Sequence, residues 1–390
     1  MATGFADQIV SHVQSQQQPL IQLLEHMVDA ESPSSVPGSH RLIISILDQA
    51  LSALDYKVSK TGTNGSHIHI YARRRNRSRQ QRAQLLLGHY DTVWPLGTVS
   101  GRPFTVDGNV IRGPGVFDMK GGLAQIVFAL KTIHELDLPL SIEPVVFINS
   151  DEEIGSRTST RYVRALAKRV ERAFVLEPAM GEEGAIKTER KGIGRFTITV
   201  HGKAAHAGLD PEGGASAILE LSHVIQSLFA LNDANKGITV NVGTVDGGLQ
   251  PNVIAPHSQA VVDVRVPTIA DGERIEKEIH GLKPVTPGVR LHIEGCIGRP
   301  SMELTPRNHA LWELAERLGQ DLGIELQHGR AGGGSDGNTT SQYTATLDGL
   351  GPVGHGAHAE HEFLYIDRTL ERTALLALLL LSPTINGEAS

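Results

Sequence analysis

The sequence predicts an α/β protein of two domains, one inserted into the other. At 390 residues the chain is long for a single hydrophobic core. The mostly apolar stretches Leu85–Leu87 and Ile142–Asn149 are followed by turn and polar residues, as buried strands of an α/β sheet are. Further along, the pattern changes to shorter alternating strands with two helices among them. We therefore expect a mixed sheet flanked by helices, formed by residues 1–189 and 303–390, and an inserted α+β unit at residues 190–302.

The composition is that of an ordinary globular protein, with 40% hydrophobic and 20% charged residues. A formal net charge of −7 argues against a nucleic-acid partner. The longest apolar run, Ala374–Leu381, is far shorter than the roughly 20 residues that span a bilayer, and no signal segment is visible. We therefore expect a cytoplasmic protein without a membrane partner. The single Cys296 excludes an intramolecular disulfide and a cysteine-based metal cage, and we expect it to be a small buried hydrophobe.

The first part of the chain predicts helices followed by a strand. Apolar residues recur at helical spacing from Ile9 to Val28, and a second helix has on one face Leu42, Ile43, Ile46, Leu47, Ala50 and Leu54. The stretch His67–Tyr71 alternates as a strand does. Arginines follow at positions 73, 74, 75, 77, 79 and 82. Because no aromatic residues are interleaved, they indicate a solvated hairpin loop rather than a patch for an anionic partner.

Chemically active side chains follow the next two predicted strands. The run Leu85–Leu87 leads into His89 and Asp91. Open α/β sheets bind ligands at the carboxyl ends of their strands, where a histidine can bind a metal while a carboxylate orients its other ring nitrogen. The strand Ile142–Asn149 ends in three acids, Asp151–Glu153. These acids repel one another unless a cation neutralises them, and a charged loop that opens a helix is the alternative.

Three more segments supply similar side chains. The glycine-rich segment Arg112–Gly122 lacks the Walker spacing of a phosphate cradle, so we interpret it as a tight turn that aims Asp118 from the start of a helix. The strand Ala173–Leu176 is followed by Glu177. A last short strand is followed by a turn that contains His358.

The side chains at these strand ends make a ligand set without thiolates, which suits zinc or a similar divalent ion. They are His89, Asp118, Glu152, Glu153, Glu177 and His358. Five ligands are too many for one tetrahedral catalytic zinc with an open position, and they suit two ions that share one bridging carboxylate. One glutamate of the 152–153 pair is then left as a general base. It would take a proton from the water that lies between the two ions, which becomes a hydroxide, and pass the proton to the leaving amine.

In the inserted unit we expect the order βαββαβ, a ferredoxin-like sandwich. The expected elements are a strand at 195–200, a helix at 215–231, strands at 238–244 and 259–266, a helix at 272–281 and a strand at 289–294. The antiparallel sheet of such a unit leaves an edge strand and one helix face available to a partner.

Five motifs in order along the chain resemble those of the M20 family of di-zinc aminoacylases and peptidases, and in particular its glutamate carboxypeptidase branch. They lie at 88–93 (GHYDTV), 113–122 (GPGVFDMKGG), 151–156 (DEEIGS), 176–178 (LEP) and 356–358 (GAH). The resemblance implies a zinc-exopeptidase-like catalytic domain with two Zn²⁺ per chain, Co²⁺ and Mn²⁺ being alternatives. It implies that Asp118 bridges the ions, that His89 and Glu177 complete one site, and that Glu153 and His358 complete the other.

The resemblance also implies roles around the metals. Glu152 would be the general base, and Asp91 would orient His89. The inserted domain would mediate homodimerisation and act as a lid. His206 matches a histidine that reaches a neighbouring active site and stabilises the oxyanion, a role that suits a donor aimed at developing charge. A surface histidine beside a glycine-containing turn is the alternative.

Three further residues match positions that hold substrate carboxylates in this branch. They are Asn252, Arg265 and Arg330, the last beside a glycine run that we expect to be a flexible loop. A strand ion pair is the alternative for Arg265. Ala185 stands where the glutamate-releasing relatives have a lysine, with Lys187 two positions later, so the resemblance does not extend to recognition of a glutamate side chain.

These expectations combine into a cytoplasmic, homodimeric di-zinc hydrolase. It would use a metal-bridging hydroxide to release a C-terminal amino acid, with glutamate as one candidate, from small N-acyl amino acids or short peptides. An N-acyl-amino-acid deacylase of the acetylornithine or succinyl-diaminopimelate type, or a dipeptidase, is the alternative with the same metals. A binding protein without catalysis is a third, against which the presence of Glu152 speaks.

Overall fold

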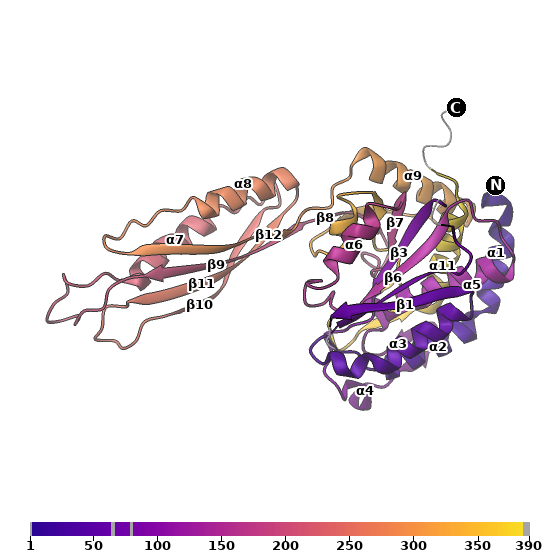
Figure 1. The fold of residues 1–390 in the computed structure, drawn as a ribbon, viewed down its shortest axis with the longest axis horizontal. Helices are drawn as coiled ribbons and strands as arrows, with labels where there is room; N and C mark the ends of the chain where they lie inside the picture. The colour runs from indigo at the N-terminus through magenta and orange to yellow at the C-terminus, as the bar shows by residue number, and fades with distance from the viewer. Residues whose placement is uncertain (1, 64–66, 79–80, 385–390) are drawn as a thin grey trace. The chain divides into compact units, whose positions relative to one another are not determined.

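The computed structural model describes residues 2–63, 67–78 and 81–384. These residues form two compact units, which Figure 1 shows in full. Unit 1 comprises residues 1–188, 304–330 and 335–390, and unit 2 comprises residues 189–303 and 331–334. The arginine at position 79, part of the predicted arginine-rich loop, lies outside the described residues.

The centre of unit 1 is a mixed sheet, in which six strands are seen among the described residues. In order across the sheet they are β1 (Tyr56–Thr63), β2 (His67–Arg74), β6 (Glu143–Asn149), β3 (Ala83–His89), β7 (Arg172–Val175) and β14 (Ala345–Leu347). The last four run parallel to one another, whereas β2 is antiparallel to both β1 and β6. His89 pairs with Asn149 at the ends of β3 and β6, so the carboxyl ends of the central strands meet at one edge.

Both faces of this sheet are covered by helices. Leu86 packs into the larger core, while Leu85 and Leu87 pack into the smaller one, because successive side chains of a strand point to opposite faces. The larger core lies under α1 (Ala6–Ser15), α2 (Gln17–Asp29), α3 (Arg41–Ser52), α5 (Gly121–Glu135), α9 (Pro306–Asp321) and α11 (Ile366–Leu381), and the smaller under α6 (Thr160–Ala167). Full burial on both faces explains why the sequence of β3 is a continuous apolar run.

Shorter elements complete unit 1. They are η1 (Ala2–Phe5), η2 (Pro37–His40), α4 (Thr98–Gly101), η3 (Val116–Lys120), α10 (Asp336–Thr340) and a small antiparallel sheet of β15 (Gly354–His355), β16 (Phe363–Tyr365), β5 (Val110–Arg112) and β4 (Thr105–Asp107). The residues of the ribbon of β8 (Ile186–Arg190) with β13 (His328–Ala331) are divided between the two units. Across the part of the chain that the structure describes, no helix is long and apolar enough to cross a membrane.

Four details differ from the sequence expectations. The apolar positions from Ile9 to Val28 belong to two helices, because the regular helix is interrupted at Gln16. Leu42 is 57% exposed, and α3 buries Ile44 and Leu51 instead. The arginine-rich loop is not a hairpin, since β6 lies between the two strands that it connects. Cys296, expected to be buried, is exposed on β12 of unit 2.

Unit 2 has the βαββαβ order. Its elements are β9 (Gly192–His201), α7 (Ala217–Phe229), β10 (Thr239–Gly247), β11 (His257–Val266), α8 (Ile269–His280) and β12 (Arg290–Arg299). The sheet is antiparallel in the order β10-β11-β9-β12, and both helices pack on one of its faces. At the two ends of the unit, Arg190 and Met302 exchange backbone hydrogen bonds of 2.9 and 3.0 Å.

Candidate metal centre

His89 ends strand β3 with its ring oriented by the main chain. The side chain is buried, and Nδ1 lies 2.9 Å from the backbone carbonyl oxygen of Asp91. Because a carbonyl oxygen can only accept, Nδ1 carries a proton. The other ring nitrogen, Nε2, lies 3.3 Å from Oδ1 of Asp118 and 3.5 Å from Oε1 of Glu177. His89 therefore presents to these carboxylates the nitrogen that a neutral imidazole would use to bind a metal.

Asp118 lies immediately before α5, in the kinked π-type turn η3. Its backbone is not helical, with φ −117° and ψ 98°, so the residue is aimed by the kink rather than by a helical turn. Oδ1 faces His89, and Oδ2 lies 3.5 Å from Nε2 of His358. The two oxygens of one partly buried carboxylate thus face two different imidazoles.

Gly122 allows α5 to approach strand β7 closely. A Cβ atom at this position would overlap with the carbonyl oxygen of Leu176, the residue before Glu177. Gly122 therefore serves the packing of the helix against the end of the strand, a use that only a residue without a side chain permits. This close packing brings the segments of Asp118 and Glu177 to the same edge of the sheet.

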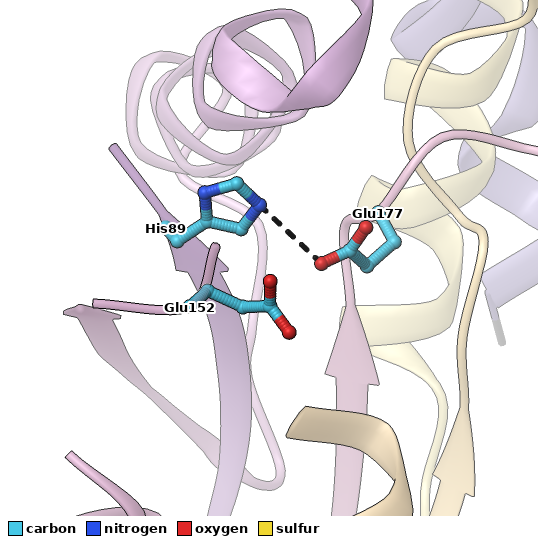
Figure 2. A group of neighbouring side chains, drawn as sticks. All are labelled: His89, Glu152 and Glu177. Atoms are coloured by element: carbon cyan, nitrogen blue, oxygen red, sulfur yellow. Dashed lines mark ion pairs between the residues drawn. The ribbon is translucent and has the colours of Figure 1, made fainter. Parts of the chain in front are cut away.

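Glu152 and Glu177 follow the ends of β6 and β7. One ligand atom from each, together with one from His89, lie within 4.8 Å of one another. Figure 2 shows the carboxylates of Glu152 and Glu177 extending toward the same space beside the His89 ring. These residues come together because β6, β3 and β7 are parallel neighbours.

Glu153 and His358 make the second part of the cluster. Oε2 of Glu153 lies 3.0 Å from Nε2 of His358, which is carried by the turn between β15 and β16. The side chain of His358 is 51% exposed, whereas that of Glu153 is 6% exposed. Ligand atoms of His89, Asp118 and Glu153 also lie within 4.8 Å of one another, so the two parts of the cluster are continuous.

Asp151, the first of the three acids after β6, does not face this cluster. Its Oδ2 accepts hydrogen bonds from the backbone N–H of Thr158 at 2.6 Å, from the Thr158 hydroxyl at 2.7 Å and from the N–H of Ser159 at 3.3 Å. Asp151 therefore closes the loop that leads into α6. The ligand set expected from the sequence did not include this residue.

The carboxylate of Asp91 holds the loop of the two glutamates. It accepts the backbone N–H groups of Glu152 and Glu153, each at 3.2 Å, and the hydroxyl of Ser34 at 2.7 Å. Burial disfavours its ionised form, yet contacts with His89, Ser34 and the Glu152 amide keep the pKa of Asp91 below its usual value. An ionised Asp91 therefore links the end of β3 to the loop after β6.

The cluster binds protons in the absence of cations. Burial raises the pKa of Glu153 to about 7, and the hydrogen bond to Glu153 raises the pKa of His358 to about 9. Burial, reinforced by the charge of Asp118, also raises the pKa of Glu177. Burial opposes protonation of His89, but hydrogen bonds to the surrounding carboxylates raise the pKa of its imidazole well above the usual value. Several carboxylates buried together favour added positive charge, whether proton or metal.

The residues present fit divalent metal ions. Oε1 of Glu153 is buried and lacks a hydrogen-bond partner among the described residues, and the buried Oδ1 of Asp118 faces Nε2 of His89, which has no proton to donate when the ring is neutral. A buried polar atom without a partner is unfavourable, and a cation would satisfy it. Imidazole nitrogens and carboxylate oxygens are ligand types of zinc, cobalt and manganese. Two imidazoles on opposite oxygens of Asp118 suit a pair of ions better than a single one.

His206 and Asn252, by contrast, belong to unit 2, where they are neighbours. The N–H of Ala207 donates to the carbonyl oxygen of Asn252 at 3.0 Å. Nδ1 of His206 accepts the N–H groups of Gly208 and Leu209, both at 3.2 Å. In the neutral ring the proton is therefore on Nε2, which makes the exposed end of His206 a hydrogen-bond donor.

The two predicted arginines lie on strands. Arg265 on β11 forms a two-point ion pair with Asp263, with Nε–Oδ2 at 2.8 Å and Nη2–Oδ1 at 3.2 Å. This is the strand ion pair that was the alternative to a substrate role. Arg330 belongs to β13 and is exposed, so the strand extends into the segment that was expected to be a loop.

Three residues that the sequence analysis did not single out contact the cluster. Ser34 binds Asp91, Met119 accepts the N–H of His89 through its sulfur at 3.3 Å, and Glu362 binds the backbone of Asp118 at 3.0 Å. Ser34 and Met119 carry no recognisable signal. For Glu362 the four-residue spacing from His358 is the one available indication.

Comparisons with known proteins agree with this geometry. The model of Peptidase family M20/M25/M40 matches residues 85–382. The chain is 26% identical over 388 residues to carboxypeptidase G2 of Pseudomonas sp. (strain RS-16), covering 96% of this chain and 92% of the relative. It is 25% identical over 358 residues to succinyl-diaminopimelate desuccinylase of Azoarcus sp. (strain BH72), covering 86% and 91%. The structure of Bacillus subtilis YXEP, described as a dinuclear metal binding peptidase from the M20 family, matches with a TM-score of 0.67 at 14% identity, over 94% of this chain and 98% of that chain.

Proposed function

The chain belongs to peptidase family M20/M25/M40, a family of metallopeptidases and amidohydrolases, and we propose that it is a two-metal carboxypeptidase. It would release a C-terminal amino acid from N-acyl amino acids or short peptides. The observation that carries this proposal is that His89 and His358 face the two oxygens of one carboxylate, that of Asp118. Similarity to carboxypeptidase G2 along nearly the whole chain supports the substrate class.

The proposed centre divides its ligands between two ions. Asp118 would be shared, His89 and Glu177 would hold one ion, and Glu153 and His358 would hold the other. Bound divalent ions would lower the pKa of a water and polarise the carbonyl of the scissile amide. Zn²⁺ is the first choice because two imidazoles and carboxylates without thiolate suit it, and Co²⁺ and Mn²⁺ accept the same ligand types.

Glu152 is the residue that we assign to proton transfer. Its carboxylate lies within 4.8 Å of ligand atoms of His89 and Glu177, while its neighbour Glu153 is engaged by His358. Glu152 would accept a proton from the attacking water and deliver it to the nitrogen of the leaving amine. The hydrogen bond from its backbone N–H to Asp91 would keep its carboxylate in place during both transfers.

For unit 2 we propose a role in homodimerisation and as a lid. Its sheet has β10 and β12 as edge strands, and large apolar side chains are exposed on and near α7 and β10, among them Leu219 (51%), Val245 (58%) and Leu249 (67%). In the proposed dimer, Nε2–H of His206 from one copy would stabilise the oxyanion in the other. The tautomer fixed by Gly208 and Leu209 supports this donor role.

The substrate carboxylate would be held by Asn252, Arg265 and Arg330. Arginine suits such a two-point contact, although at Arg265 a substrate would compete with Asp263 for the guanidinium. Ala185 is 7% exposed and offers no charge to a glutamate side chain. The proposal therefore concerns recognition of the C-terminal carboxylate, with glutamate as one candidate among amino acids.

A second candidate function is deacylation of N-acyl amino acids by the same centre. The similarity to a succinyl-diaminopimelate desuccinylase over 86% of the chain favours it. A dipeptidase is a further variant, because all three reactions hydrolyse an amide bond next to a carboxylate-bearing residue.

A substrate panel distinguishes these functions. The purified protein, loaded with Zn²⁺, Co²⁺ or Mn²⁺ in turn, would be assayed with acyl-glutamates, other N-acyl amino acids, acyl-ornithines, N-succinyl-diaminopimelate and dipeptides. We expect turnover of peptides or acyl amino acids that have a free C-terminal carboxylate. Turnover of acyl-ornithine or the succinyl compound alone would replace the carboxypeptidase assignment by the deacylase. Absence of turnover across the panel, with two ions bound, would refute both.

A further inference from the structure

Glu362 is a buried carboxylate that makes four hydrogen bonds. The residue is 2% exposed. Its Oε1 accepts the backbone N–H groups of Phe117 at 2.9 Å and Asp118 at 3.0 Å. Its Oε2 accepts the N–H of Gly115 at 2.8 Å and the indole N–H of Trp94 at 3.0 Å. Each oxygen thus has two donors, an arrangement that only an ionised carboxylate satisfies completely.

The donors come from segments that carry other parts of the metal centre. Residues 115–118 wrap around the carboxylate and end in Asp118 itself. Trp94 lies on the loop that follows His89 and Asp91. Glu362 therefore connects the backbone of the bridging carboxylate with the loop after β3.

Glu362 also ends the turn that carries His358. Within this turn the N–H of Ala359 donates to the carbonyl oxygen of Gly356 at 2.8 Å, and the N–H of Glu362 donates to that of Ala359 at 3.1 Å. The turn is tight, since a Cβ atom at Gly356 would lie 3.0 Å from Cα of Glu362. His358 is held inside it with φ of 62°. A displacement of Glu362 is therefore transmitted to His358.

We propose that Glu362 is a positioning residue of the metal centre, which sets the spacing between Asp118 and His358. The inference rests on the proposed two-metal function and adds a residue outside the assigned ligands. Because Nε2 of His358 and Oδ2 of Asp118 are 3.5 Å apart, an ion between them needs both segments held in register. One side chain anchored in both segments provides that register, as partners behind metal ligands commonly do.

Glu362→Gln tests the charge without a large change in shape. A glutamine has one acceptor oxygen, so its amide group would face two N–H donors that it cannot accept. Glu143→Gln is the matched control: Glu143 is 8% exposed and lies at the start of β6, at the opposite end of that strand from the cluster. If Glu362 had a purely structural role, Glu362→Gln and Glu143→Gln would both change the stability of the protein. Neither variant would then change its metal affinity.

The experiment titrates the metal-free full-length protein with Co²⁺, with calorimetry and visible absorption as readouts. We expect wild type and Glu143→Gln to bind about two ions, and Glu362→Gln to lose about 10- to 100-fold affinity for one ion with a changed cobalt spectrum. His358→Ala should affect the same ion, and the double variant should lose less than the two single losses added together. Circular dichroism and thermal unfolding of each metal-free protein check the fold.

Wild-type affinities and spectrum in a folded Glu362→Gln would overturn the inference, as would strict additivity with His358→Ala. If Glu362→Gln does not fold, Glu362→Asp takes its place. Aspartate keeps the charge but is one methylene shorter, so it cannot reach all four donors, and unchanged cobalt binding would equally overturn the proposal. Failure of the wild type itself to bind two ions would instead refute the proposed two-metal function.

Discussion

Nδ1 of His89 lies 2.9 Å from the backbone carbonyl oxygen of Asp91 and 3.5 Å from its carboxylate oxygen Oδ1. The shorter contact is to the main chain, so the orientation of the ring depends mainly on the fold of the strand end. The Asp91 carboxylate is directed instead to the amides of Glu152 and Glu153 and to Ser34. We therefore expect its main task to be holding the proposed base, with orientation of His89 as the lesser one.

Asp91→Asn should separate these two tasks. The backbone contact to His89 survives, whereas an asparagine cannot accept all the donors now bound by the carboxylate. We expect metal content near that of the wild type and a fall in kcat of about 10- to 100-fold. Elemental analysis and steady-state kinetics measure the two quantities. A loss of metal as large as that of His89→Ala would show instead that the carboxylate orients the ring.

Glu152→Gln should retain the metals and lose turnover. Removing a residue that transfers protons typically lowers kcat by about 10²- to 10⁴-fold, while its shape and its backbone N–H remain. Glu182→Gln, an exposed glutamate in the turn before β8, is the matched control and should match the wild type. An unchanged kcat in a metal-loaded Glu152→Gln would refute the assigned role.

Metal affinity should rise with pH. A bound ion requires Glu153 ionised and His358 neutral, but their pKa values are raised to about 7 and about 9. Between these values His358 must release one proton, and below about pH 7 Glu153 must release a second. The apparent affinity of this ion should therefore fall as pH is lowered, with a logarithmic slope of about one between pH 9 and pH 7 and about two below pH 7. Calorimetry in buffers of different ionisation enthalpy counts the protons, and affinity independent of pH would contradict the assignment.

His206→Ala should lower kcat more than it raises KM. A donor to the oxyanion acts in the transition state, so its loss typically costs about 10²- to 10³-fold in kcat. His201→Ala is the control, since His201 is an exposed histidine on β9 of the same unit. Metal content should be that of the wild type in both variants. If His206→Ala and His201→Ala had equal kcat and KM, His206 would have no catalytic role. It would then be the surface histidine that the sequence analysis considered as the alternative.

Gly122→Ala should destabilise unit 1. A methyl group there would overlap with the carbonyl oxygen of Leu176 and push α5 away from β7, at a cost of roughly 1–3 kcal/mol. Gly101→Ala is the control, because no atom lies within 4 Å of a Cβ at that position, and it should change stability by less than about 1 kcal/mol. Urea unfolding of the metal-free proteins gives both values. Equal stability of the two variants would contradict the close packing.

The sequence predicted the strands that carry the centre because their burial on both faces leaves continuous apolar runs. His89 and Glu177 could be located for the same reason, since each follows such a run directly. Asp151, which was not among the expected ligands, turns to Thr158 and Ser159, and no local pattern in the sequence records these hydrogen bonds.

Other features depend on contacts between distant segments. Glu362 receives its donors from residues near 94 and 115–118, and no local pattern records that relationship. The arginine-rich loop was taken for a hairpin because strand β6, which separates the two strands it joins, comes much later in the chain. Leu42 has the right helical phase for burial, but the neighbouring elements cover Ile44 and Leu51 instead.

The pairing of Arg190 with Met302 has a consequence for how the two units share one chain. The free-energy cost of an insertion depends on the span between its ends, and here the ends are joined by two backbone hydrogen bonds. In terms of this free-energy cost, the insertion of unit 2 is therefore equivalent for unit 1 to the insertion of a short closed loop. A change in the length of the insert between these ends therefore adds little entropic cost to the folding of the strands that carry the proposed metal ligands.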